Sequence, residues 1–106
     1  MDHTSLRITL QEEENALTIK LEGRLAEPLV GELSRTWRSL ASSLAHKALV
    51  IDLHDLISID RAGIAVLGEI YGQSNAQFRA DTPLTKYFAG EAVQSHINKK
   101  TTRGAI

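Results

Sequence analysis

The feature that most constrains the fold is a short apolar run that leads into a helix with a clear start. Residues 48–53 read ALVIDL, a nearly continuous apolar run rich in β-branched residues. Such a run predicts a strand buried on both faces, as in the centre of a parallel sheet. A short loop follows, and Asp60 then stands where the next helix needs a side-chain cap. The pattern therefore predicts a strand, a loop and a capped helix within one layered domain.

Two segments with alternating apolar residues precede this run and predict a β-hairpin. In residues 6–10 and again in residues 17–21, every second side chain is apolar, as in a half-buried strand. The polar, acidic residues 11–15 between them are expected to form a solvated turn. Gly23 is expected to end the second strand.

A helical stripe follows the hairpin. After Pro28, apolar residues recur at steps of three and four, at Leu29, Leu33, Trp37, Leu40 and Leu44. Pro28 suits the first turn of this helix, where its missing N–H costs nothing. Trp37 is interpreted as a core anchor rather than a platform for a ligand.

The helix after Asp60 is expected to pack closely on the sheet. Its predicted buried face consists of Ala62, Ala65, Val66, Ile70 and Tyr71. The small residues that would permit the close approach are Ala62, Gly63, Ala65 and Gly68.

A short strand and a third helix are predicted near the end of the chain. Residues 77–80 form the strand candidate, and Thr82 and Pro83 suit the cap and the first helical position. The expected apolar face of this helix is Leu84, Tyr87 and Phe88. Gly90 either ends the helix or lets it continue toward Ile97. Residues 98–106 are polar and basic and are expected to form a flexible tail.

The predicted element order is β-β-α-β-α-β-α. Strands that alternate with helices after a hairpin indicate an α/β fold, with a mixed sheet of four to five strands and helices packed on it. A chain of 106 residues is long enough for one compact domain and too short for two. We expect a single domain over residues 1–106, with its core in residues 6–97.

Composition excludes several classes of function. The net charge of −1 creates no field toward nucleic acid or an anionic membrane, and no aromatic residues interleave with the basic ones near the C-terminus. The absence of cysteine excludes disulfides and thiolate chemistry, and it fits a reducing cytoplasm. No secretion signal is visible, and no apolar run approaches the roughly 20 residues that span a bilayer. We expect a cytoplasmic protein without membrane insertion or nucleic-acid binding.

No pattern of residues indicates catalysis or metal binding. The histidines are scattered without ligand spacing, at His3, His46, His54 and His96. Neither a glycine-rich phosphate loop nor a nucleophile elbow occurs. Asp52, Asp55 and Asp60 could mimic a metal or acid–base cluster, but a strand end, a loop and a helix cap explain them more simply. Asp52 either bonds a loop or belongs to a site. We expect no metal, no cofactor and no enzymatic activity.

Residues 48–63 resemble the STAS domain of bacterial anti-sigma factor antagonists. In that family a strand ending in Asp-Leu leads through a short loop to Asp-Ser-Ser/Ala-Gly-Leu and a helix, and this chain reads HDLISIDRAGI. LEGRLAEPLVGEL resembles the Gly-Arg-Leu element that enters the first helix of the family, and AQFRADTPLTKYFAGEAV resembles its last strand, turn and final helix. The resemblance covers residues 6–93.

The resemblance implies a regulator of transcription that works by binding proteins. In the family, a kinase that is itself an anti-sigma factor docks near the start of the helix after the motif. It phosphorylates the serine or threonine that directly follows the motif aspartate, and phosphorylation releases the antagonist. That position is Arg61 here, which has no hydroxyl, and Ala26-Glu27 departs from an aspartate that relatives often carry. The expected partner-binding residues are Glu27, Ser58, Asp60, Arg61, Ala62 and Gly63.

Three hypotheses follow. The first is a partner-binding regulator that is not switched at the usual residue, in which Arg61 meets an acidic group on a diverged anti-sigma factor or kinase-like protein. The second is a stand-alone STAS adaptor subunit of a transporter or signalling complex. The third is a module that binds a small ligand between Asp52, Asp55 and Arg61, at the strand ends where open α/β sheets bind ligands. The oligomeric state, a homo-oligomer included, stays open.

Overall fold

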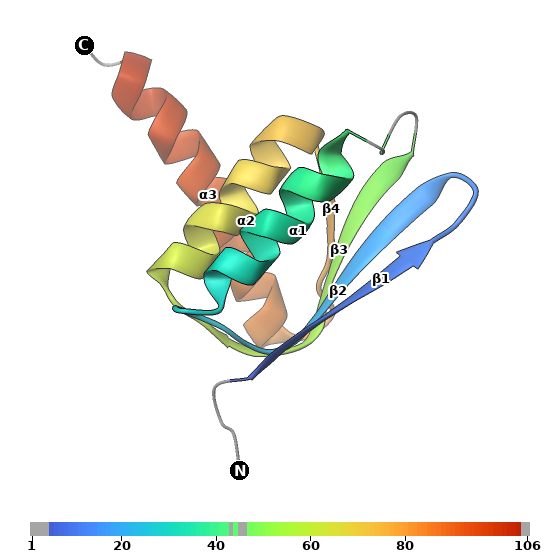
Figure 1. Cartoon of the computed structure of the whole chain (residues 1–106). Helices are drawn as coiled ribbons and strands as arrows, with labels where there is room; N and C mark the ends of the chain where they lie inside the picture. The colour runs from blue at the N-terminus through green and yellow to red at the C-terminus, as the bar shows by residue number, and fades with distance from the viewer. Residues whose placement is uncertain (1–4, 43, 45–46, 105–106) are drawn as a thin grey trace.

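Figure 1 shows the computed structural model, which describes residues 5–42, 44 and 47–104. It has the predicted order β-β-α-β-α-β-α and a mixed four-stranded sheet with the strand order β1-β2-β3-β4. The elements are β1 Leu6–Glu12, β2 Ala16–Leu25, α1 Val30–Ala41, β3 Ala48–Ile59, α2 Arg61–Ser74, β4 Gln77–Arg79 and α3 Pro83–Gly104. The described residues contain no fifth strand.

The predicted hairpin is confirmed, but both strands run beyond their predicted ends, and Gln11 and Glu12 belong to β1 rather than to the turn. β1 pairs antiparallel with β2, from Leu6 opposite Gly23 to Glu12 opposite Leu17. Gly23 lies inside β2 with φ 97°, and a Cβ there would collide with the carbonyl oxygen of Ser5. The register between β2 and β3 shifts just after Gly23. Gly23 therefore accommodates an irregular point within the strand, and the prediction that it ends β2 is wrong.

β3 also extends farther than predicted, through the whole of the expected loop. β2 runs parallel to it as far as Leu25 opposite Ile59, so residues 54–59 have a strand partner and stay extended. Within β3, Leu49 and Ile51 are buried, whereas Val50 on the opposite face is only partly buried. Figure 1 shows that the helices gather on one face of the sheet. The expectation of a strand buried on both faces is therefore wrong.

α1 begins later than the proline suggested. Pro28 lies in a turn that is closed by a 2.8 Å hydrogen bond from the Leu29 N–H to the Ala26 carbonyl oxygen, and the helix starts at Val30. The prediction of Pro28 in the first helical turn is wrong, because the chain must first turn from the end of β2 onto the face of the sheet.

The apolar stripe of α1 is largely confirmed. Leu33 and Trp37 are buried in the core, and Leu40 and Leu44 pack against the core while partly exposed. Leu44 lies beyond the end of the helix at Ala41. Trp37 is a core anchor as predicted, with 7% of its surface exposed.

α2 packs against α3 as well as against β3, and this changes its predicted buried face. Its buried residues are Gly63, Leu67, Gly68 and Ile70. The predicted members that are only partly buried are Ala62, Val66 and Tyr71. Ala65 is exposed, so its predicted burial is wrong. A Cβ at Gly68 would lie 2.8 Å from the Ala92 carbonyl oxygen, so this glycine serves the contact with α3 rather than with the sheet.

The start of α3 is confirmed. The Thr85 N–H donates to Thr82 Oγ1 at 3.1 Å, and the Thr82 N–H donates to Thr85 Oγ1 at 3.1 Å. This reciprocal cap leaves Thr85 only 1% exposed and fixes which side of the helix faces the core.

The rest of α3 differs from the prediction. Phe88 is buried as expected, but Leu84 and Tyr87 are 49% and 60% exposed, so they do not belong to the buried face. Because Thr85 faces the core, the other core-facing positions of α3 follow it at steps of three and four. Leu84 and Tyr87 fall outside this series and point outward. Gly90 does not end the helix, which continues to Gly104. Residues 98–104, predicted as part of a flexible tail, are therefore helical.

Candidate functional site

Asp60 holds the junction between β3 and α2. Its backbone is extended, and its Oδ1 accepts a 2.8 Å hydrogen bond from the Gly63 N–H, which confirms the predicted cap. Its Oδ2 accepts a second hydrogen bond, of 3.0 Å, from the Glu27 N–H. Its own N–H donates to the Leu25 carbonyl oxygen at 3.1 Å. One side chain thus ties the start of α2 to the turn that follows β2.

Gly63 allows the first turn of α2 to lie directly against the sheet. A Cβ at this position would be 2.5 Å from the Leu25 carbonyl oxygen and 2.7 Å from Ile59 Cγ1. Distances this short would force the backbone apart. The predicted close approach of this helix to the sheet is confirmed at Gly63. The hydrogen bonds of Asp60 to Gly63 and to Glu27 hold the start of α2 in this position.

A groove between α2 and α3 opens beside this junction. It has a volume of about 540 Å³ and is lined by Ile59, Asp60, Arg61, Ile64, Glu91, Gln94 and Ser95. Arg61 is exposed and is the first residue of α2, whose first turn carries no acidic side chain. The helix N-terminus adds a partial positive charge of its own. Glu91 on α3 contributes a negative charge, so the α2–α3 groove carries opposite charges from its two helices.

The structure brings together only part of the predicted partner-binding set. Asp60 and Arg61 line the α2–α3 groove, and Glu27 joins them through its backbone while its side chain is exposed. Gly63 is buried, so it shapes the site without offering a surface. The predicted members that are partly buried are Ser58 and Ala62.

Sequence reasoning missed the residues that α3 contributes to the groove. They are Glu91, Gln94 and Ser95. Their spacing of three and four is that of one helix face, which was a usable signal. The sequence left open whether the helix ends at Gly90, and these residues belong to the site only because α3 continues past it.

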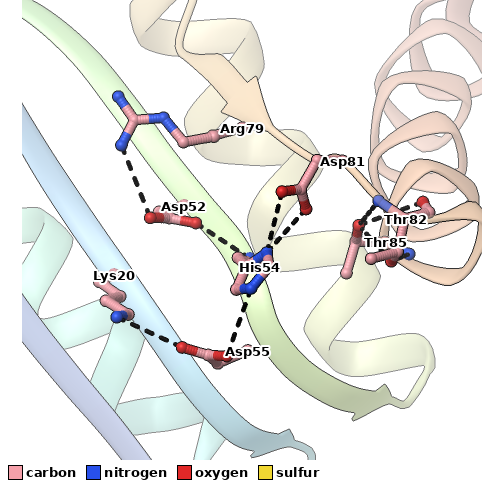
Figure 2. A network of polar contacts seen from close by, with 8 residues as sticks. All are labelled: Lys20, Asp52, His54, Asp55, Arg79, Asp81, Thr82 and Thr85. Carbon is pink, nitrogen blue, oxygen red and sulfur yellow. Dashed lines mark hydrogen bonds and ion pairs between the residues drawn. The ribbon is translucent and has the colours of Figure 1, made fainter.

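Asp52 and Asp55, in the middle of β3, belong to a separate polar network on the sheet (Figure 2). Asp52 accepts a 2.9 Å hydrogen bond from the His54 N–H and lies 3.6 Å from Arg79 Nη1 of β4. Asp55 Oδ2 lies 3.3 Å from Lys20 Nζ of β2. Each carboxylate therefore faces a cation of a neighbouring strand. This answers the question left open for Asp52, which bonds its own strand and pairs with Arg79.

His54 is the centre of this network. Its Nδ1 lies 2.8 and 3.0 Å from the two carboxylate oxygens of Asp81, and its Nε2 lies 3.9 Å from Asp55 Oδ1. The hydrogen bond to Asp81 raises the pKa of His54 above its usual 6.5, and the charges of Asp81 and Asp55 act in the same direction. The same hydrogen bond lowers the pKa of Asp81 below its usual 3.8. His54 thereby joins β3 to the connection between β4 and α3 (Figure 2).

The network has no arrangement suited to a metal ion. Among the described residues, no three or more His, Cys, Asp or Glu side chains form a group that could hold one. His96 packs edge-on against Tyr71, with ring centroids 5.7 Å apart. His3 and His46 lie outside the described residues. Arg61 lines the α2–α3 groove, whereas Asp52 and Asp55 face Arg79 and Lys20, so the third hypothesis lacks the common cleft that it needs.

No helix within the described ranges has the length and apolar character needed to cross a membrane. The chain matches no protein-family model and no curated protein.

Proposed function

We propose that this chain is a non-enzymatic, protein-binding regulator of the anti-sigma factor antagonist type, and that it binds its partner at the α2–α3 groove. The observation that carries the proposal is the place of Arg61. It is exposed at the first residue of α2, beside a groove whose geometry is held by Asp60 and Gly63. The resemblance to STAS domains supports the same surface, because partners of that family dock near the start of this helix.

The partner is recognised by charge and shape at this groove. Arg61 has five N–H donors in a planar fork, which suits a carboxylate of the partner. Glu91 on the other helix suits a basic or hydrogen-bonding group, and Ile59 and Ile64 add apolar lining. The partner is an anti-sigma factor or kinase-like protein, in the cytoplasm, with an acidic group at the position that meets Arg61.

Phosphorylation does not control this interaction at the usual residue. Arg61 has no hydroxyl, and its positive charge is opposite to that of a phosphoserine at the helix start. Ser58, a hydroxyl residue two positions before Asp60, is partly buried within β3. The regulator is therefore not switched by a phosphate at position 61.

Affinity capture from a lysate of the native cells tests the proposal. Tagged wild-type chain should retain a sigma-regulatory or kinase-like protein, and Arg61→Glu should lose it because the charge at the groove is reversed. Arg38→Glu is the matched control, since Arg38 is an exposed arginine on α1 and does not line the groove. Capture of the same protein by Arg61→Glu would overturn the proposal. Capture of a permease or membrane ATPase in its place would favour the adaptor hypothesis instead.

A further inference from the structure

β1 is an edge strand whose outer side has no strand partner among the described residues. The sheet order is β1-β2-β3-β4, so β1 pairs with β2 alone (Figure 1). An edge strand exposes a row of backbone N–H and C=O groups that can pair with another chain. Natural proteins usually protect such an edge with proline, a bulge or inward-pointing charges. Leu6–Glu12 contains no proline, and its pairing with β2 is regular over all seven residues.

The backbone pattern shows which residues have free groups at this edge. The Glu13 N–H donates to the Ala16 carbonyl oxygen, and the Arg24 N–H donates to the Ser5 carbonyl oxygen. In an antiparallel pair, hydrogen-bonded and non-hydrogen-bonded residues alternate. Odd-numbered residues of β1 therefore bond β2, and the even-numbered ones direct their N–H and C=O groups outward. These are Leu6, Ile8, Leu10 and Glu12.

Three of these four side chains are apolar, and they line a groove that no other described segment covers. Leu6, Ile8 and Leu10 line it from β1, and α1 and the turn before it contribute Leu29, Glu32 and Thr36. The β1–α1 groove has a volume of about 470 Å³. Leu10 is 45% exposed, one of the few large apolar side chains at the surface. The free backbone edge and the apolar groove therefore lie along one strand.

We propose that this edge is an interface between two copies of the chain, in which β1 pairs antiparallel with β1 of the partner about a two-fold axis at Thr9. In this register all seven residues of β1 are paired, and Ile8 lies opposite the partner's Leu10. The even-numbered residues, whose backbone groups point outward, face one another in this register. The two chains can therefore form the interchain hydrogen bonds without a change of backbone conformation. The two sheets then form one continuous sheet, and the two β1–α1 grooves meet.

The charges at the two ends of the hairpin favour this antiparallel arrangement. Exposed Arg7 and Arg24 lie at one end, and the exposed acidic residues Glu13 and Glu14 lie at the turn. The two-fold axis brings the acidic turn of each copy beside the basic end of the other, with the partner's Glu13 diagonal to Arg7. A parallel arrangement would place like charges together. The chain is thus self-complementary at this edge.

Sedimentation velocity over a range of concentrations tests the interface. The wild type should pass from monomer to dimer, and Leu10→Lys should raise the dimer dissociation constant at least about tenfold, because both copies lose an apolar contact. Leu84→Lys is the matched control, because Leu84 is 49% exposed on α3 and does not line the β1–α1 groove. A wild type that stays monomeric throughout, or equal weakening by both variants, would overturn the proposal.

Cross-linking tests the register independently. The chain has no cysteine, so Thr9→Cys introduces a single thiol. At the axis the two Thr9 positions form a non-hydrogen-bonded pair with Cα atoms about 4.5 Å apart, a distance that a disulfide can bridge. Gln11→Cys is the control, because the register places it opposite the partner's Arg7. Mild oxidation should link Thr9→Cys at least about tenfold faster than Gln11→Cys. Equal rates would overturn the register, and with it the proposal.

Discussion

Asp60 shows how one residue can set the geometry of a site. Its two carboxylate oxygens accept hydrogen bonds from the N–H groups of Gly63 and Glu27, at 2.8 and 3.0 Å. The first bond was predictable from its place before a helix, and the second depends on a turn 33 residues earlier in the chain. The residue is therefore a cap and also a tie between two segments.

Replacing Asp60 with alanine should lower the free energy of unfolding by about 0.5–2 kcal/mol, toward the upper end because two N–H groups lose their acceptor. Urea denaturation followed by circular dichroism measures this. Asp60→Asn is the control, since asparagine also caps helices well and should cost less. An unchanged denaturation midpoint for Asp60→Ala would contradict the assigned role.

Gly63 should be intolerant of even a methyl group. Gly63→Ala places a Cβ 2.5 Å from the Leu25 carbonyl oxygen, and overpacking of this kind costs about 1–3 kcal/mol. Gly90→Ala is the matched control, because Gly90 is also in a helix and a Cβ there meets nothing within 4 Å. That control should stabilise the protein by about 0.5–1 kcal/mol. Thermal unfolding of both variants gives the comparison, and a similar shift in both would refute the close contact.

Arg61 can be tested by restoring the hydroxyl that the motif lacks. Incubation of the wild type with ATP and the proposed kinase-like partner should leave its intact mass unchanged. Arg61→Ser should gain one phosphate at that position, because it presents a hydroxyl at the start of α2. Mass spectrometry distinguishes the two results. A phosphate on the wild-type chain, at Ser58 or elsewhere, would overturn the proposal of a regulator that phosphorylation does not switch.

At the scale of elements, His54 joins parts of the fold that are far apart in the sequence. It connects β3 with Asp81, which directly precedes the Thr82 cap of α3 (Figure 2). The charged groups around it are Lys20, Asp52, Asp55, Arg79, Asp81 and Lys86. The strength of the His54–Asp81 ion pair should therefore depend on pH, and so should the attachment of the start of α3 to β3.

The sign of this response follows from the pKa shifts. The pKa of His54 is raised in the folded state, so its contribution to stability is complete below 6.5 and is lost as pH rises through the higher folded value. The pKa of Asp81 is lowered, so its contribution is present above 3.8 and is lost as pH falls through the lower folded value. The ion pair between His54 and Asp81 therefore stabilises the fold most between about pH 3.8 and pH 6.5.

His54→Gln should accordingly destabilise the protein more at about pH 5.5 than at about pH 8.5. Thermal unfolding of wild type and variant at the two pH values measures the difference, and the comparison cancels the titration of the other histidines. NMR titration should place the pKa of His54 above 6.5, with a lower value in Asp81→Asn. Equal destabilisation at both pH values would show that the pair adds nothing to stability.

At the scale of the whole molecule, the two proposed surfaces are separate. The α2–α3 groove is lined by α2, α3 and the end of β3, whereas the β1–α1 groove is lined by β1, α1 and the turn before it. A dimer joined through β1 would therefore leave both α2–α3 grooves accessible. Leu10→Lys should weaken the dimer while it preserves partner capture, and Arg61→Glu should prevent partner capture while it preserves the dimer. Loss of both activities in either variant would indicate one shared surface.

Local patterns in the sequence were sufficient for the order of elements and for both helix caps. Asp60 and Thr82 act within three residues of themselves, so their neighbours in the sequence define their roles. The hairpin was equally predictable, because its alternation and its turn lie within one short segment. Arg61 was identified as the main functional question from its place after Asp60, and it is exposed at the groove.

Only the tertiary structure decided features that depend on partners far along the chain. β3 continues to Ile59 because Leu25 of β2 lies beside it, and Leu84 is exposed because Thr85 faces the core. Glu91 reaches the site because α3 packs along α2 beyond Gly90. The sequence by itself thus determined which elements form, where two helices begin and which residue departs from the motif. Packing determined how long the elements are and which faces remain open, because burial and strand pairing are properties of the assembled fold.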